Sequence, residues 1–274
     1  MYWYSSLERR RRTGGYCLNI LNRIINDDCI KGLQAVYEEY GECIDLCITD
    51  PPYGIDYQSN WGREGSKLKK IVNDGDLTWF QDFSDVCFNV LKNNSAFYCF
   101  TRFDVYPQMY NCLIKSGFKV KNLLIVQKGQ KGGNGDLQAQ YSNDCEMLIY
   151  ANKGRRKFNK TKLAKTDGRK GAAEFRTRLP NVWFDTEYNT YPKSTVNVSN
   201  QKDAIIHPTE KNVEMIKWFL EISSNQNDVI LDPFMGSGTT AIACINTQRN
   251  YIGFELEQEY HKLSEDRIHN LVLK

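Results

Sequence analysis

The sequence predicts an α/β fold in which helices on both faces cover a mostly parallel, twisted sheet with a circularly permuted strand order. Three observations support this prediction. The run Ile44 to Asp50 is short and ends at two prolines, as expected of a buried strand that stops at a rigid turn. The run Val229 to Asp232 leads into a glycine-rich loop, a helix at about Thr239 to Thr247 and a strand at Tyr251 to Glu255. The chain ends at residue 274, too soon for the remaining strands, so these must come from upstream.

The permuted order makes a spatial prediction about the two aspartate-ending runs. We expect the strand Ile44 to Asp50 to lie beside the strand Val229 to Asp232. Both strands would then deliver their terminal aspartates to the same edge of the sheet. Ligands of open α/β sheets bind at that edge, so the two aspartates mark the predicted site.

The segments between these strands carry weaker periodic patterns, which still predict alternating helices and strands. Helical spacing is present at Trp79 to Leu91, Tyr106 to Lys115 and Asn212 to Ile222. Strand-like runs are present at Ser95 to Thr101, Leu123 to Val126 and Met147 to Tyr150. We find no internal repeat, and we expect a single domain over residues 1–274.

Composition narrows the class of protein. Apolar residues make up 41% of the chain and charged residues 25%, as in an ordinary globular protein. The longest apolar runs fall far short of the roughly 20 residues that cross a bilayer, so we expect no membrane partner. The basic run Arg9 to Arg12 lacks a following cleavage site, and we expect a cytoplasmic protein. Nine cysteines without a CxxC pair, and only three histidines, favour reduced thiols and no metal.

Positive charge is concentrated in one segment, although the net charge is only +3. Between Lys153 and Lys170 lie nine lysines and arginines and a single acid, Asp167. Such a segment would bind phosphates. The alternative interpretation is a solvated loop that happens to be basic.

The glycine-rich loop from Asp232 to Thr240 has the features of a nucleoside-binding turn. Gly236 and Gly238 allow a tight turn and close backbone approach to a ligand, and Glu255, 17 residues after Gly238, ends the next strand, where a carboxylate can bind two ribose hydroxyls. The loop has neither GxGxxG nor the GKS or GKT of a phosphate cradle, which favours a nucleoside without a pyrophosphate. The structural alternative is a strand-turn-helix corner.

The second motif is Asp50-Pro51-Pro52-Tyr53. The prolines fix the backbone, so that the Asp50 carboxylate and the Pro51 carbonyl can point at one place beside the flat Tyr53 ring. Two acceptors and a stacking face match an exocyclic amine on a planar base, and hydrogen bonds from its two hydrogens help to localise the nitrogen lone pair as it attacks. A Pro-Pro turn after a strand is the structural alternative.

Together these motifs resemble the β group of the S-adenosylmethionine-dependent DNA amino-methyltransferases. The DPPY of Asp50 to Tyr53 is similar to the catalytic motif of that family, and DPFMGSGTT at Asp232 to Thr240 resembles its cofactor motif, in the order that the β group shows. IINDDCIKGL at Ile24 to Leu33 resembles the segment before the catalytic strand. His207-Pro-Thr-Glu-Lys211 is similar to the HPTxKP element, although Asn212 replaces its last proline.

The resemblance implies a Rossmann-like methyltransferase fold and a role for each matching residue. The implied catalytic residues are Asp50, Pro51, Pro52 and Tyr53. The implied cofactor-binding residues, for S-adenosyl-L-methionine, are Asp28, Asp232, Phe234, Gly236, Gly238, Thr239, Glu255, His207 and Lys211. Asp28 would accept from the adenine amine of the cofactor, with Asp27 as the competitor for that role, and His207 and Lys211 would close over the methionine end.

The resemblance also implies an activity. The expected reaction is methyl transfer to the N6 amine of a flipped-out adenine in double-stranded DNA, and by analogy target recognition would lie in an insertion at about residues 128–200. Cytosine N4 is the first alternative, an RNA or protein amide target is a further one, and a non-catalytic nucleic-acid-binding module is the alternative outside enzymes. The resemblance leaves open a homodimer and a cognate restriction enzyme as partners.

Overall fold

A computed structural model describes residues 19–53, 76–127, 139, 145–159, 182–183 and 211–272. Its strands are β1 (Arg23–Ile25), β2 (Ile44–Thr49), β3 (Leu91–Thr101), β4 (Lys119–Gln127), β5 (Cys145–Lys153), β6 (Val182–Trp183), β7 (Val229–Asp232) and β8 (Asn250–Phe254). Its helices are α1 (Cys29–Tyr40), α2 (Phe80–Val90), α3 (Tyr106–Ser116), α5 (Val213–Ser223), α6 (Thr239–Asn246) and α7 (Gln258–Val272). Among these helices, none has the length and apolar character to span a bilayer.

The strands form one sheet in the order β1-β8-β7-β2-β3-β5-β4-β6. Within the described residues every strand pair is parallel except those of β5, which runs antiparallel to both β3 and β4. β7 pairs with β2 in parallel, with Cys47 opposite Leu231. The predicted permuted order is therefore confirmed, and the strands that end at Asp50 and Asp232 are neighbours.

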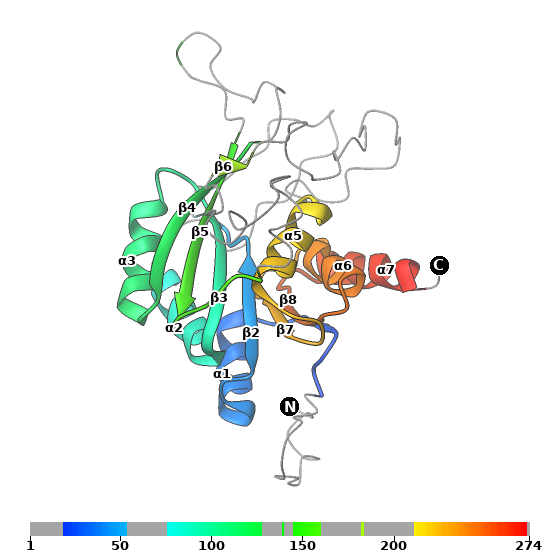
Figure 1. Cartoon of the computed structure of the whole chain (residues 1–274). Coiled ribbons are helices and arrows are strands. Elements are labelled where there is room, and N and C mark those ends of the chain that lie inside the picture. The colour runs from blue at the N-terminus through cyan, green and yellow to red at the C-terminus, as the bar shows by residue number, and fades with distance from the viewer. Residues whose placement is uncertain are drawn as a thin grey trace.

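Helices cover both faces of this sheet (Figure 1). Successive side chains of β2 alternate between the faces, because a strand has a period of two. Cys47 packs in a core cluster with residues of α1, α2 and α3, whereas Leu46 and Ile48 pack in the cluster that contains residues of α5 and α6. Burial on both faces explains why β2 and β7 are almost continuous apolar runs.

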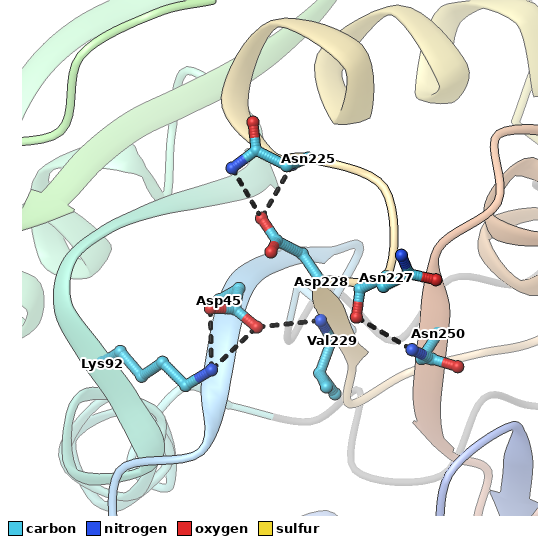
Figure 2. A network of polar contacts seen from close by, with 7 residues as sticks. All are labelled: Asp45, Lys92, Asn225, Asn227, Asp228, Val229 and Asn250. Carbon is cyan, nitrogen blue, oxygen red and sulfur yellow. Dashed lines mark hydrogen bonds and ion pairs between the residues drawn. The ribbon is translucent and has the colours of Figure 1, made fainter. Parts of the chain in front are cut away.

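A polar network ties β2 to β7 at the edge opposite their terminal aspartates (Figure 2). The Asp45 carboxylate accepts a hydrogen bond of 2.9 Å from the backbone N–H of Val229 and forms an ion pair of 2.8 Å with Lys92. Beside it, Asp228 accepts from the backbone N–H of Asn225 at 2.7 Å. These contacts fix the amino ends of two strands that lie far apart in the sequence, and so fix how their carboxyl ends meet.

Several elements are longer than the sequence predicts, or escape prediction. β3 begins at Leu91, four residues before the predicted start at Ser95. Its first residues, including Lys92 and Asn94, are exposed and polar, so they lack the apolar pattern that predicts a strand. α1 was not predicted as a helix, although Asp28 caps it by accepting from the backbone N–H of Lys31 at 3.0 Å. α7 carries many charged residues and only a weak apolar stripe, so its periodicity did not identify it.

The span 128–200, where the resemblance places a recognition insertion, also contributes to the main sheet. β5 lies between β3 and β4, and β6 pairs with β4. Apart from residue 139, residues 145–159 and β6, this span lies outside the described residues. Its role in target recognition therefore stays a prediction.

The basic run from Lys153 begins with a structural residue. Lys153 is buried, forms an ion pair of 3.0 Å with Glu42 and donates a 2.7 Å hydrogen bond to the carbonyl of Phe88. It stands opposite Ser95 at the end of β5, on the sheet edge away from Asp50. The prediction that the run collects phosphates is therefore wrong for Lys153. Residues 160–170 of the run lie outside the described part of the chain.

Candidate active site

Four neighbouring parallel strands carry carboxylates where they end. Asp28 follows β1, Glu255 follows β8, Asp232 ends β7 and Asp50 follows β2. Because β1, β8, β7 and β2 are adjacent and parallel, these four residues lie along one edge of the sheet. Burial raises the pKa of Asp232, and the charge of Asp50 adds to that rise, as expected of two carboxylates at the same edge.

The Asp50 motif forms a turn in which the aspartate and the tyrosine are bonded to each other. The Tyr53 hydroxyl donates to one carboxylate oxygen of Asp50, Oδ1. Burial, and then the negative charge of Asp50, raises the pKa of Tyr53 well above its ordinary value, so the phenol stays protonated and remains a donor. The stacking role of Tyr53 stays a prediction. Pro51 is buried and Pro52 is half-buried.

Lys211 contacts the other oxygen of Asp50. Its ammonium lies 2.7 Å from Asp50 Oδ2 and 3.4 Å from Glu146 Oε1, and it lies 4.6 Å above the centre of the Phe100 ring. Burial acts to lower the pKa of Lys211, but Asp50 and Glu146 outweigh it and leave the pKa raised. The resemblance assigns Lys211 to the methionine end of the cofactor. In the structure it contacts the catalytic motif, and its role at the methionine end of the cofactor stays a prediction.

Asn212 gives a physical reason for the departure from the HPTxKP pattern. It is the N-cap of α5, and its side chain accepts from the backbone N–H groups of Glu214 at 2.8 Å and Met215 at 3.4 Å. The cap fixes the start of the helix directly after Lys211. His207, the other candidate of this element, lies outside the described residues.

The Asp232 carboxylate organises the glycine-rich loop. It accepts from the backbone N–H of Phe234 at 3.1 Å and from the Thr240 hydroxyl at 2.6 Å. Gly238 has φ +84°, a left-handed conformation that favours glycine, and α6 begins directly after it. The loop is therefore held at both ends, at the strand by Asp232 and at the helix by Thr240.

Glu255 lies against the same loop. Its oxygens accept from the backbone N–H of Gly236 at 2.8 Å and from that of Glu257 at 2.9 Å. Each carboxylate oxygen has two lone pairs, so each oxygen can still accept from one hydroxyl of a diol. Burial raises the pKa of Glu255, and the two backbone donors oppose that rise. This geometry fits the predicted ribose site.

Two further loop residues are packed. Phe234 packs against Trp79 and Phe83, with ring centroids 5.6 and 5.3 Å away. Thr239, the first residue of α6, is buried, and its hydroxyl is 3.4 Å from that of Ser237. Both residues therefore hold the loop through contacts within the protein. Their contacts with a cofactor stay predictions.

Asp28 has a structural task as well as the predicted one. One of its oxygens, Oδ1, caps α1, and its backbone N–H donates to the Asp27 carboxylate at 2.7 Å. The cap and the bond to Asp27 hold Asp28 at the edge of the sheet, beyond the end of β1. Its role toward a cofactor adenine stays a prediction.

Sequence reasoning missed three residues that hold the site. Glu146 pairs with Lys211, Asn26 donates to the backbone carbonyls of Glu255 at 2.8 Å and Leu256 at 3.1 Å, and Arg267 of α7 donates to the carbonyl of Ser237 at 3.1 Å. A basic residue in a carboxyl-terminal helix carries no local signal for such a contact. For Glu146, its position directly before an apolar strand was the one available clue.

The ionisation of Asp232 makes stability depend on pH. Burial raises the pKa of Asp232 from 3.8 to about 7, although bonds from Thr240 and Phe234 lower it. Between about pH 4 and pH 7 the folded protein therefore binds more protons at this residue than the unfolded chain does, and the free energy of unfolding falls as pH rises, by on the order of 3 kcal/mol. We expect Asp232→Asn to remove this part of the fall, as measured by urea unfolding across that window. Equal slopes in both proteins would contradict the assignment.

The sequence matches one family profile, and the match covers most of the site. A profile described as DNA methylase, of the N6 and N4 type, matches residues 44–266, which include Asp50, Asp232 and Glu255. Among curated proteins, DNA adenine methyltransferase YhdJ of Escherichia coli (strain K12) is 25% identical over 267 residues, 91% of this chain and 83% of YhdJ.

Two solved structures resemble the fold over nearly its whole length. The M1.HpyAVI–SAM complex has a TM-score of 0.61 and 25% identity, and the match covers 90% of this chain and 98% of that chain. The PvuII DNA methyltransferase, a cytosine-N4-specific enzyme, has a TM-score of 0.63 and 18% identity over 89% of this chain and 87% of its own. Both share the overall fold of this chain.

Proposed function

The chain belongs to the DNA methylase family of the N6 and N4 type, and from this premise we propose that it transfers a methyl group from S-adenosylmethionine to the N6 amine of adenine in double-stranded DNA. One observation carries the proposal. β2 and β7 are adjacent and parallel, so Asp50 and the loop after Asp232 lie at the same sheet edge. A methyl donor held at one strand end can then reach an amine held at the next.

The residues at the end of β7 and β8 fit the cofactor. Glu255 would accept from two ribose hydroxyls, since each of its oxygens has a lone pair left after the bonds from Gly236 and Glu257. Gly236 and Gly238 leave room for close backbone approach. When bound, S-adenosylmethionine supplies a methyl group made electrophilic by its sulfonium. That a related structure is a SAM complex supports this choice.

The residues after β2 would activate the amine. The Asp50 carboxylate and the Pro51 carbonyl would accept from its two hydrogens, which helps to localise the nitrogen lone pair as it attacks the methyl carbon. The nitrogen–carbon bond would form as the sulfur–carbon bond of the donor breaks, S-adenosylhomocysteine would leave, and the nitrogen would then release one proton to water. Stacking on the Tyr53 ring would contribute on the order of 1–3 kcal/mol, comparable to the cost of extruding a base.

Adenine is favoured over cytosine by the residue at the first motif position. Family members with aspartate at this position mostly act on adenine, and here it is Asp50. The name of the relative YhdJ, an adenine methyltransferase, agrees. Cytosine N4 stays the alternative because both amines fit the same two acceptors, and PvuII methyltransferase shows the same fold with cytosine-N4 specificity.

The test is incubation of the protein with unmethylated DNA and labelled S-adenosylmethionine, followed by digestion and identification of the modified nucleoside. We expect label in N6-methyladenine. Label in N4-methylcytosine would show that the target is the N4 amine of cytosine. Label in RNA or protein instead of DNA would reject DNA as the substrate class. Salt-dependent DNA binding without methyl incorporation would support the non-catalytic module and contradict the proposal.

A further inference from the structure

The acceptor carboxylate of Asp50 belongs to a cluster built from three separate parts of the chain. Lys211 lies two residues before α5, Glu146 is the second residue of β5, and Asp50 follows β2. The Lys211 ammonium lies 2.7 Å from Asp50 and 3.4 Å from Glu146. All three side chains are largely buried, with exposed fractions of 14% for Lys211 and 20% for each of the two acids.

The cluster fixes the direction of Asp50. The Tyr53 hydroxyl donates to Oδ1, and the Lys211 ammonium contacts Oδ2. One donor on each oxygen leaves a lone pair on each oxygen for an incoming amine. Rotation of the carboxylate away from this position would break both contacts, so the acceptor is held ready before the base arrives.

We propose that Glu146 is a positioning residue for methyl transfer: it holds the Lys211 ammonium against Asp50. This inference rests on the proposed function. Glu146 acts through Lys211, because its carboxylate contacts the ammonium. Without the Glu146 carboxylate, the buried Lys211 ammonium would pair with Asp50 alone and would lose the second contact that holds it in place.

The test is Glu146→Gln, which keeps the shape of the side chain and removes its charge. We expect the single-turnover rate of methyl transfer to fall about 10- to 100-fold, with little change in the affinity for S-adenosylmethionine or in the melting temperature. Glu146→Asp, which keeps the charge, should recover part of the rate. Glu214→Gln is the matched control, since it removes a carboxylate that pairs with Lys217 at 2.8 Å on the same helix that Lys211 precedes.

A double-mutant cycle separates this role from a merely structural one. If Glu146 acts through the ammonium, Glu146→Gln should lower the rate less than about threefold in the Lys211→Met background. An equal loss in both backgrounds, or a full rate in Glu146→Gln, would overturn the inference. If the unaltered protein transfers no methyl group to DNA, the proposed function fails instead, and the two failures are thereby distinguished.

Discussion

Replacing Asp50 with alanine is expected to lower the single-turnover rate of methyl transfer to DNA by about 100- to 1000-fold, with the affinity for S-adenosylmethionine unchanged within about twofold. The substitution removes the acceptor for the target amine. It also frees the Tyr53 hydroxyl and the Lys211 ammonium, which both contact Asp50 in the structure. The rate is measured with the protein in excess over DNA and with saturating labelled cofactor, and the affinity is measured by calorimetry.

The chain offers a matched control in the same strand. Asp45 also pairs with a lysine, Lys92, at 2.8 Å, but at the opposite end of β2. Asp45→Asn should therefore keep the full rate at temperatures where the protein is folded. Full activity in Asp50→Ala would remove Asp50 from the mechanism, and an equal loss in Asp45→Asn would assign the effect to the stability of the strand.

The second large effect is expected at the cofactor site. Glu255→Ala should weaken binding of S-adenosylmethionine about 100-fold, because two hydrogen bonds to a charged group together contribute about 3 kcal/mol. Glu255→Gln should lower the affinity for S-adenosylmethionine less, since the amide keeps one oxygen that can accept a hydrogen bond. Calorimetric titration of each variant measures the loss.

The control for this series is Glu265→Gln, which alters a glutamate on α7 whose side chain is 59% exposed. Its affinity should match that of the unaltered protein. Unchanged affinity in Glu255→Ala would reject the ribose assignment. A loss of secondary structure in that variant would instead show that the bond from Gly236 to Glu255 is needed for the loop to fold.

The sequence alone was enough to place the two strands that carry the chemistry. The runs that end at Asp50 and Asp232 are apolar and β-branched and are followed by proline, and their short lengths leave little choice of structure. Their adjacency is predicted because too few residues remain after the glycine-rich loop to form the other strands of the sheet, so those strands must come from upstream. Local pattern and a simple topological rule therefore predicted the sheet edge and the candidate residues on it.

The contacts among those residues were beyond sequence reasoning. Glu146 reaches Lys211 only because β5 runs antiparallel beside β3, which places Met147 opposite Thr101 at the end of that strand. No periodic pattern encodes that register, because β5 is buried and apolar through most of its length. For the same reason the basic run gave a misleading prediction at Lys153. Charge along a sequence does not reveal which side chain is buried against Glu42.

The pairing of β2 with β7 has a consequence for synthesis of the protein on the ribosome. Asp45 and the backbone of Val229 meet across 184 positions, and β8 lies between β7 and β1. A nascent chain that has emerged as far as β6 has β2 with one edge unpaired, and β7 and β8 must insert between β1 and β2 afterwards. Such long-range closure is slow and leaves an open strand edge during translation. A product truncated after α5 would retain Asp50 but could not complete the sheet, and would tend to aggregate.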